Sequence, residues 1–363
     1  MTVREDAWPD GPLEAVREAS GRALAHASAY EARQSLEEAK RASGMARRLG
    51  RLEESAGALA AASLAHYYQA GLVDAVVAAL DAVRRGRDDA GLARAWFAAS
   101  LAFLALGARD VARACAHRSR DRAEAAADAA LLARAHFALG FAANEEGSHE
   151  EAAVELRKAC RLLRGHGDRT LAMKAVGNLA RTWHDRGEAA AAAGRAADAR
   201  RAWRHAARLF AVAARIPATS GDQLIVKGSL GAVLERLGQA RRALPLVEES
   251  VGLLTPESLP WLAAESHLRS ARVRLALDDL EGAAADLEAA AATCRDDRAV
   301  PARVDCHLLN AELAGRLGRR DKEAVFRAYA RTAKLRRDEE IASARRQALA
   351  LWARFESADA GRP

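Results

Sequence analysis

Apolar and polar positions along the chain repeat as a helix, a turn and a second helix that carries a small residue near its start. The clearest unit is LGFAANEEGSHEEAAVELRKA, residues 139–159, and a second is LGAVLERLGQARRALPLVEES, residues 230–250. The turn residues are Gly71, Gly107, Gly147, Gly194, Gly238, Asp278 and Gly318. Their sequence numbers differ successively by 36, 40, 47, 44, 40 and 40. This periodicity predicts about eight helical hairpins, each of which leans on its neighbours.

A small residue follows most of the turns by five positions. Where the two helices of a hairpin cross, only a methyl group or a hydrogen lets the backbones approach closely, so an alanine there has a packing role. These residues are Ala112, Ala152, Ala199, Ala243 and Ala283, with Ala324 one place further on in the last repeat. The repeat that contains Gly194 is longer by seven residues. Seven residues make two helical turns, so the helix lengthens without rotating its buried face.

The composition supports an all-helical chain. Of the 363 residues 94 are alanine, and only 5% are aromatic. Alanine is the strongest helix former, whereas strands favour the β-branched and aromatic residues that are scarce here. The net charge is +7, from 56 basic and 49 acidic residues, but acidic residues are interspersed throughout and no run of five basic residues occurs. This mixture disfavours nucleic acid as a ligand.

The repeat pattern resembles the tetratricopeptide repeat (TPR) family, specifically its long bacterial regulatory type. The resemblance covers residues 50–330, with a weaker unit at 13–50. The residues that match the family pattern are Trp96, Phe103, Gly107 and Ala112 in one repeat, Leu139, Gly140, Gly147, Ala152, Leu156 and Ala159 in the next, and Leu230, Gly231, Gly238 and Ala243 in a later one. The usual period is about 34 residues, so these helices are longer. The resemblance implies an all-α, right-handed superhelix, the α-solenoid of antiparallel helix pairs.

We expect a disordered segment over residues 1–12, the solenoid over 13–330, a long C-terminal helix over 331–356 and a disordered tail over 357–363. Within the helix, apolar residues follow the 3-4 spacing of a coiled-coil seam. The seam residues are Ile341, Ala344, Ala348, Leu351 and Phe355. Two interpretations stay open: the helix covers apolar surface of its own solenoid, or its seam forms a homodimer. The helix also resembles linkers that follow TPR arrays and precede GGDEF-type signalling domains, but the chain has no GGDEF motif.

Sequence motifs of catalysis are missing from the chain. It has no phosphate-binding G-x-x-x-x-G-K-[ST] loop, no H-E-x-x-H helix and no G-x-S-x-G turn. The ten histidines include no pair four residues apart, and the four cysteines form no C-x-x-C motif. We therefore predict that the chain is not an enzyme and needs no metal or cofactor. The cysteines, Cys115, Cys160, Cys294 and Cys306, are expected to be reduced thiols in the core.

The longest window without a formal charge is 55–73. It contains His66, Gln69 and Gly71 in an alanine-rich stretch, so a buried helix of a soluble protein is expected rather than a membrane span. The acidic first twelve residues contain no apolar stretch of the kind a secretory signal has. A cytoplasmic location is predicted, with no membrane partner.

In the TPR family a concave groove is lined by the first helix of each pair, and the matching positions here are the candidate binding residues. Arg94, Arg134 and Lys174 recur at one repeat interval and would form a basic ladder. The full set is Arg94, Phe97, Leu101, Arg134, Phe137, Phe141, Asn144, Lys174, Asn178, Arg181 and His184. Cations beside exposed rings suit an acidic peptide or protein segment. The alternative is that the phenylalanines pack between hairpins and the cations are merely solvated.

The leading prediction is a non-catalytic scaffold or sensor module that binds a peptide or protein partner in its groove, in bacterial signalling. Two alternatives stay open. One is a peptide-sensing regulator of transcription that reaches DNA through a partner, and the other is an RNA-binding helical repeat protein.

Overall fold

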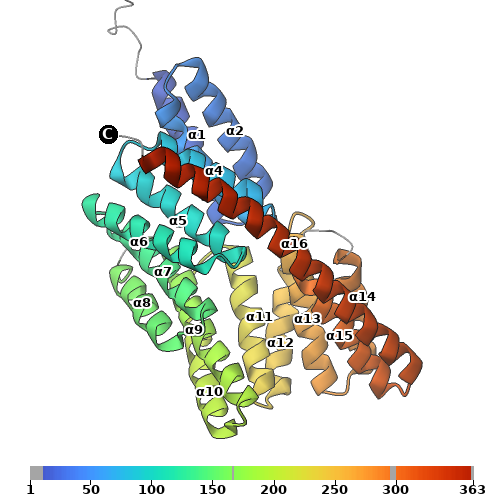
Figure 1. Cartoon of the computed structure of the whole chain (residues 1–363). Coiled ribbons are helices and arrows are strands. Elements are labelled where there is room, and N and C mark those ends of the chain that lie inside the picture. The colour runs from blue at the N-terminus through green and yellow to red at the C-terminus, as the bar shows by residue number, and fades with distance from the viewer. Residues whose placement is uncertain (1–10, 166, 295–299, 361–363) are drawn as a thin grey trace, which may run out of the picture. The chain divides into compact units, whose positions relative to one another are not determined.

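The computed structural model describes residues 11–165, 167–294 and 300–360. Within these ranges the chain forms sixteen α-helices and a short 3-10 helix, Leu52–Ser55, and no strand (Figure 1). Residues 1–10 and 361–363 lie outside the described ranges, and most of the two segments expected to be disordered falls there. The described part of those segments is helical, since the first helix begins at Gly11 and the last reaches Ala360.

The chain divides into two compact units. Unit 1 is formed by the described residues of Met1–Ala138 and Ala344–Pro363, and unit 2 by those of Leu139–Ser343. Two helices contribute to both units, α7 (Ala129–Glu145) and α16 (Arg320–Ala360). The expected boundary at residue 330 is not a break in the backbone, because α16 is one continuous helix of 41 residues.

Unit 1 consists of three complete helix pairs with parts of α7 and α16. The pairs are α1 (Gly11–Ser28) with α2 (Ala32–Arg48), α3 (Ala56–Tyr68) with α4 (Leu72–Arg85), and α5 (Asp89–Ala105) with α6 (Arg109–Ala125). The first helices of successive pairs also pack on one another, α1 on α3 and α3 on α5. Much of the core is alanine: Ala23, Ala61 and Ala79 have no exposed surface.

Unit 2 continues the same arrangement. Its helices, besides the parts of α7 and α16, are α8 (His149–Leu162), α9 (Arg169–Ala192), α10 (Ala196–Ala213), α11 (Ser220–Arg236), α12 (Ala240–Gly252), α13 (Pro260–Ala276), α14 (Leu280–Thr293) and α15 (Val300–Arg316). The long pair α9–α10 confirms the predicted insertion, since α9 has 24 residues. One hydrophobic core of unit 2 contains Met173 of α9, Phe210 of α10 and Val233 of α11.

The predicted turns are almost all confirmed by the backbone. Gly107, Gly147, Gly194, Gly238 and Gly318 have positive φ angles, and so does Asp278 at 63°. The prediction of Gly71 is wrong by one residue: Ala70 has the positive φ, 60°, and Gly71 has a φ of −78°. Tyr30 also has a positive φ and precedes Ala70 by one repeat interval, so the first hairpin shares the period.

The predicted close approach of paired helices is also present. Ala112, Ala152, Ala243 and Ala283 have no exposed surface, and Ala199 is 1% exposed. A Cβ atom on Gly231 would lie 2.5 Å from Cγ1 of Val247, because α11 and α12 touch there. The placement of Ala324 is wrong, since this residue is exposed on α16.

Polar side chains fix the ends and the pairing of several helices. Asp88, Asp128 and Asp168 recur at one repeat interval, and each accepts a hydrogen bond from a backbone N–H in the first turn of α5, α7 or α9. Buried serines bond across a pair: Ser119 Oγ of α6 donates to the Ala93 carbonyl of α5 at 2.9 Å, and Ser250 Oγ of α12 donates to the Leu224 carbonyl of α11 at 2.9 Å.

Candidate functional site

The predicted seam residues of α16 divide between the two units. Ile341 belongs to unit 2 and is half-buried, as are Ala344 and Leu351 of unit 1, whereas Ala348 and Phe355 are buried. The last two are covered by helices of the same chain, as the first of our two interpretations of this helix expects. Homodimerisation through the seam stays a prediction.

The end of α16 enters an aromatic cluster of unit 1. The ring of Phe355 lies 5.8 Å from that of Trp96, and Trp352 lies 6.1 Å from Trp96, both centroid to centroid and edge-on. The guanidinium of Arg118 stands 4.8 Å from the Trp96 ring and 5.1 Å from the Trp352 ring, and its Nη2 lies 2.7 Å from Oε1 of Glu356. Neither Trp352 nor Arg118 was among the predicted site residues.

Three predicted apolar groove residues are not available on the surface. Phe97, Leu101 and Phe137 are 7%, 5% and 9% exposed. The rings of Phe97 and Phe137 pack together, 6.4 Å apart, between α5 and α7. The expectation of exposed rings is therefore wrong for both, and the packing alternative describes them. Phe141 differs, because it is only half-buried.

The basic ladder has members of different character. Arg94 and Arg134 are half-buried on α5 and α7 of unit 1. Lys174 lies on α9 of unit 2, where its Nζ is 3.5 Å from Oδ1 of Asp222, a carboxylate that is 2% exposed. Thr219 Oγ1 donates to the same carboxylate at 2.7 Å. Lys174 therefore neutralises a buried charge of its own chain.

The register of α9 offers a second counterpart for the ladder. Arg94 and Arg134 stand thirteen residues before the positive-φ glycine of their hairpin, and so does Arg181. Lys174 stands seven residues earlier than Arg181, a distance of two helical turns, so both lie on one face of α9. Sequence reasoning counted from the start of the helix and so placed Lys174 in the ladder.

Several predicted residues meet in one polar cluster of unit 2, which we call the first-helix network. It consists of Asn144, Glu145, Arg181, His184 and Asp185, from α7 and α9. Asn144 Nδ2 donates to Oδ2 of Asp185 at 2.7 Å, and Nη2 of Arg181 donates to Oε1 of Glu145 at 2.6 Å. Arg181 also lies 3.5 Å from Asp185, and Nδ1 of His184 is 3.2 Å from Oδ1 of Asp185. Asp185 therefore joins three of the predicted residues.

The electrostatics of the network favour a charged Asp185. Burial raises the pKa of this carboxyl. The hydrogen bonds from His184 and Asn144 and the charge of Arg181 together lower the pKa by more than burial raises it, so it lies below its usual value. The guanidinium of Arg181 also stacks 5.1 Å from the centre of the Phe141 ring. Asn178 lies outside the network, since its amide donates to the Lys174 carbonyl of its own helix at 2.9 Å.

Beyond the network the charges remain mixed. Arg236 of α11 lies 3.1 Å from Glu188 of α9, and Glu188 is 3.6 Å from Nε2 of His184. Glu235 is half-buried, and burial raises its pKa above the usual value. The first helices of unit 2 thus present paired charges of both signs rather than a uniformly basic surface.

Two acidic members of the network, Glu145 and Asp185, were missed by sequence reasoning. Asp185 follows Arg181 by four residues, a spacing that places the two on one helix face. That signal was present in the sequence, but the partners on α7 are distant along the chain.

Among the described residues no group of three or more His, Cys, Asp or Glu side chains is placed to hold a metal ion, and no described helix is long and apolar enough to cross a membrane.

No protein-family model matches the sequence, and no curated protein matches it. Solved structures do match its fold, among them a Rap protein complexed with competence and sporulation factor (TM-score 0.54, 13% identity, covering 91% of this chain and 99% of that one). A second is the Rap conjugation gene regulator of plasmid pLS20 in complex with the Phr* peptide (TM-score 0.58, 13% identity, covering 90% of this chain and 95% of that one). A third is NprR in complex with its cognate peptide NprX (TM-score 0.53, 12% identity, covering 97% of this chain and 100% of that one). At such identities the likeness is one of fold: the chain has the TPR-type helical-repeat fold that its period predicts.

Proposed function

We propose that this chain is a non-catalytic, peptide-sensing helical-repeat regulator that binds its ligand on the first-helix network of unit 2. The observation that carries the proposal is the joining of α7 and α9 around Asp185, by the buried amide of Asn144 and by the half-exposed side chains of Arg181 and Glu145. Packing of α7 against α9 does not by itself need these polar side chains, because the apolar faces of helices already stabilise their packing.

The chemistry of the network suits a peptide in an extended conformation. Arg181 and His184 can donate to backbone carbonyls or to a carboxylate of the ligand, and Glu145 can accept from backbone N–H groups. The buried amide of Asn144 holds Asp185 in place beneath them. The half-buried ring of Phe141, under the guanidinium of Arg181, offers an apolar surface for one side chain. Structures of similar fold hold a peptide, as their names state, which supports a peptide ligand.

The pairing of the cations bears on the charge of the ligand. Arg181 already contacts Glu145 and Asp185, and Lys174 contacts Asp222. A strongly acidic ligand would have to displace these carboxylates and would meet their repulsion. We therefore expect peptides with polar residues and both signs of charge to bind more tightly than peptides that are acidic throughout.

A selection from a random peptide library, followed by affinity measurements with the selected peptides, tests this proposal. Arg181→Gln removes the bonds to Glu145 and Asp185 and is expected to weaken binding about tenfold or more, since a charge-assisted hydrogen bond contributes about 1.5–3 kcal/mol. Arg186→Gln is the matched control: Arg186 is also on α9 and stacks 5.1 Å from an aromatic ring, that of Trp183. Equal affinity of the two variants, or a library that yields no binder, would contradict the proposal.

Participation in bacterial signalling, and control of transcription through a partner, are finer predictions that such a peptide would help to test. Once a peptide is selected, its sequence can be compared with secreted peptides of the source organism. If the chain binds only RNA-like polyanions and no peptide, the RNA-binding alternative is favoured instead.

A further inference from the structure

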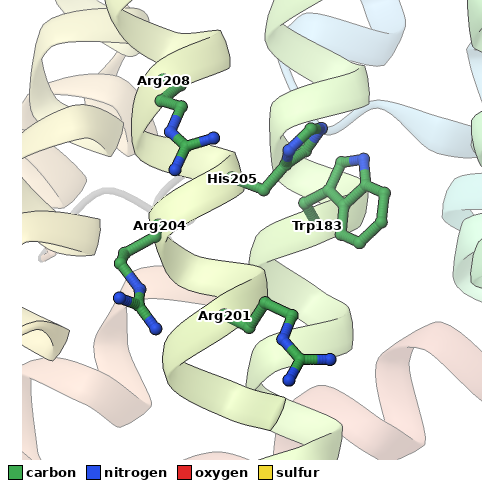
Figure 2. A pocket seen from close by; sticks show the side chains of 5 residues that line it. All are labelled: Trp183, Arg201, Arg204, His205 and Arg208. Atoms are coloured by element: carbon green, nitrogen blue, oxygen red, sulfur yellow. The ribbon is translucent and has the colours of Figure 1, made fainter. Parts of the chain in front are cut away.

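A pocket of about 210 Å³ lies between α9 and α10 in unit 2 (Figure 2). It is lined by Trp183 of α9 and by four residues of α10, which are Arg201, Arg204, His205 and Arg208. None of these residues belongs to the first-helix network, and none was predicted as a binding residue from the sequence.

The three arginines of the pocket carry uncompensated charge. All three are exposed, and among the residues that the structure describes no carboxylate oxygen lies within 4.0 Å of their guanidinium nitrogens. Arg204 Nε donates to the carbonyl of Arg200 at 3.3 Å. Elsewhere in unit 2, arginines such as Arg181 and Arg274 have carboxylate partners at 2.6 Å. Like charges on one helix face repel one another. A bound anion would offset this repulsion and attract guanidinium groups that have no carboxylate partner of their own.

The cationic stretch has a defined length. Arg201 and Arg208 are seven residues apart, about 10.5 Å along the helix. One turn before Arg201, Asp198 lies 3.8 Å from Arg195 and ends the unpaired stretch. The three arginines therefore span a greater length than a single phosphate group needs.

The aromatic side of the pocket is formed by two rings in contact, whose planes are tilted by 55°. The rings of Trp183 and His205 lie 4.3 Å apart (Figure 2). The guanidinium of Arg186 stands 5.1 Å from the Trp183 ring. Burial, with the charges of Arg208 and of Arg157 on α8, lowers the pKa of His205. The neutral imidazole can still donate one N–H bond to an anion. The apolar rings also exclude water on one side, which strengthens the attraction between the arginines and a bound anion.

We propose that this pocket binds a small molecule with two or three linked phosphoryl groups, such as the polyphosphate chain of a nucleotide. Each guanidinium can form two parallel hydrogen bonds to phosphate oxygens, and a chain of phosphates distributes its charge over the length that Arg201, Arg204 and Arg208 span. The site lies on the second helix of its pair and does not depend on the peptide proposed above.

Isothermal titration calorimetry of the full chain with inorganic tripolyphosphate, at constant ionic strength, tests the proposal. The double variant Arg204→Gln/Arg208→Gln is expected to lower the affinity at least about tenfold, because it removes charge-assisted hydrogen bonds. The matched control is Arg241→Gln/Arg242→Gln on α12, which removes the same charge from exposed arginines away from the pocket and should leave the affinity unchanged. A parallel titration with adenosine triphosphate distinguishes a nucleotide, which should bind more tightly if its base contacts the rings, from free polyphosphate.

Three outcomes would overturn the proposal. The first is the absence of tripolyphosphate binding, and the second is an equal loss of affinity in both double variants, which would mean non-specific charge attraction. The third is binding of a single-stranded RNA oligonucleotide or a polyglutamate peptide that depends on the same arginines and is tighter than the binding of tripolyphosphate. Circular dichroism of each variant checks folding, and Arg201→Gln provides a second pocket variant if the double variant is unfolded.

Discussion

The indole ring of Trp352, near the end of α16, packs edge-on against the ring of Phe103 in α5, with the two centroids 5.5 Å apart. Phe103 has no exposed surface and Trp352 is 9% exposed. Residues that are far apart in the sequence thus share one core, and unit 1 includes residues 344–360 together with the helices from the first part of the chain. A C-terminal helix that projected into solvent would leave the ring of Trp352 exposed.

Replacement of Trp352 by alanine is expected to destabilise unit 1 by about 3–5 kcal/mol, the usual cost of removing a buried tryptophan. The substitution removes the contacts with Phe103, Trp96 and Arg118 together. Leu349→Ala is the control, because Leu349 lies on the same helix and is 38% exposed. Urea denaturation monitored by circular dichroism measures both variants. If they unfold at the same urea concentration, the end of α16 is not docked in solution.

The helix crossings give a prediction with an internal control. Ala152→Leu and Ala243→Leu are expected to cost about 1–3 kcal/mol each, because a larger side chain forces apart two helices in contact. Ala324→Leu should cost almost nothing, because Ala324 is exposed. Thermal denaturation compares the three variants. A similar loss of stability in all three variants would show that the crossing positions are no more sensitive to a larger side chain than an exposed helix position, which would contradict the prediction.

The repeat could be predicted from the sequence because its signals are local. A turn residue and an alanine five positions later lie within one hairpin, and their spacing survives in the structure. The slip at Ala70 has an equally local cause, since the sequence shows Gly71 beside it and glycine is the usual residue at positive φ. Ala324 was misplaced because it faces solvent on α16, whereas the alanines of the other pairs are buried between helices.

The contacts of α16 and the members of the first-helix network could not be predicted in the same way. The seam spacing showed that Ala348 and Phe355 share a face, but the same spacing fits a partner chain and the chain's own core equally well. Asn144 and Asp185 lie on different hairpins, and only the stacking of α7 and α9 brings them within 2.7 Å. Long-range pairs of this kind follow from the fold rather than from any local pattern.

Lys174 is expected to affect stability more than ligand binding. Lys174→Met leaves the buried carboxylate of Asp222 without its cation, and loss of one partner of a buried pair costs about 3 kcal/mol or more. Arg94→Met, at the corresponding place on α5, should cost less, because Arg94 is only half-buried and pairs with no buried carboxylate among the described residues. Chemical denaturation compares the two variants, and similar stabilities would contradict the assignment of Lys174 to a structural pair.

Asp185 predicts a pH dependence whose sign follows from its lowered pKa. A carboxyl with a lower pKa in the folded chain stabilises that chain at pH values above its unfolded pKa, about 3.9. The contribution is lost as the pH falls through the folded pKa. Asp185→Asn should therefore reduce the free energy of unfolding by about 1.5–3 kcal/mol at pH 7, the contribution of a hydrogen bond to a charged group.

The difference between wild type and Asp185→Asn should stay constant from neutral pH to about pH 5 and shrink below about pH 4, as the carboxyl takes up a proton. Asp121→Asn is the control, since Asp121 is exposed on α6 beside Arg120. Urea denaturation across this pH range measures all three proteins. A gap that widens toward acid pH would mean that burial dominates and that His184, Asn144 and Arg181 do not hold Asp185 in its charged form.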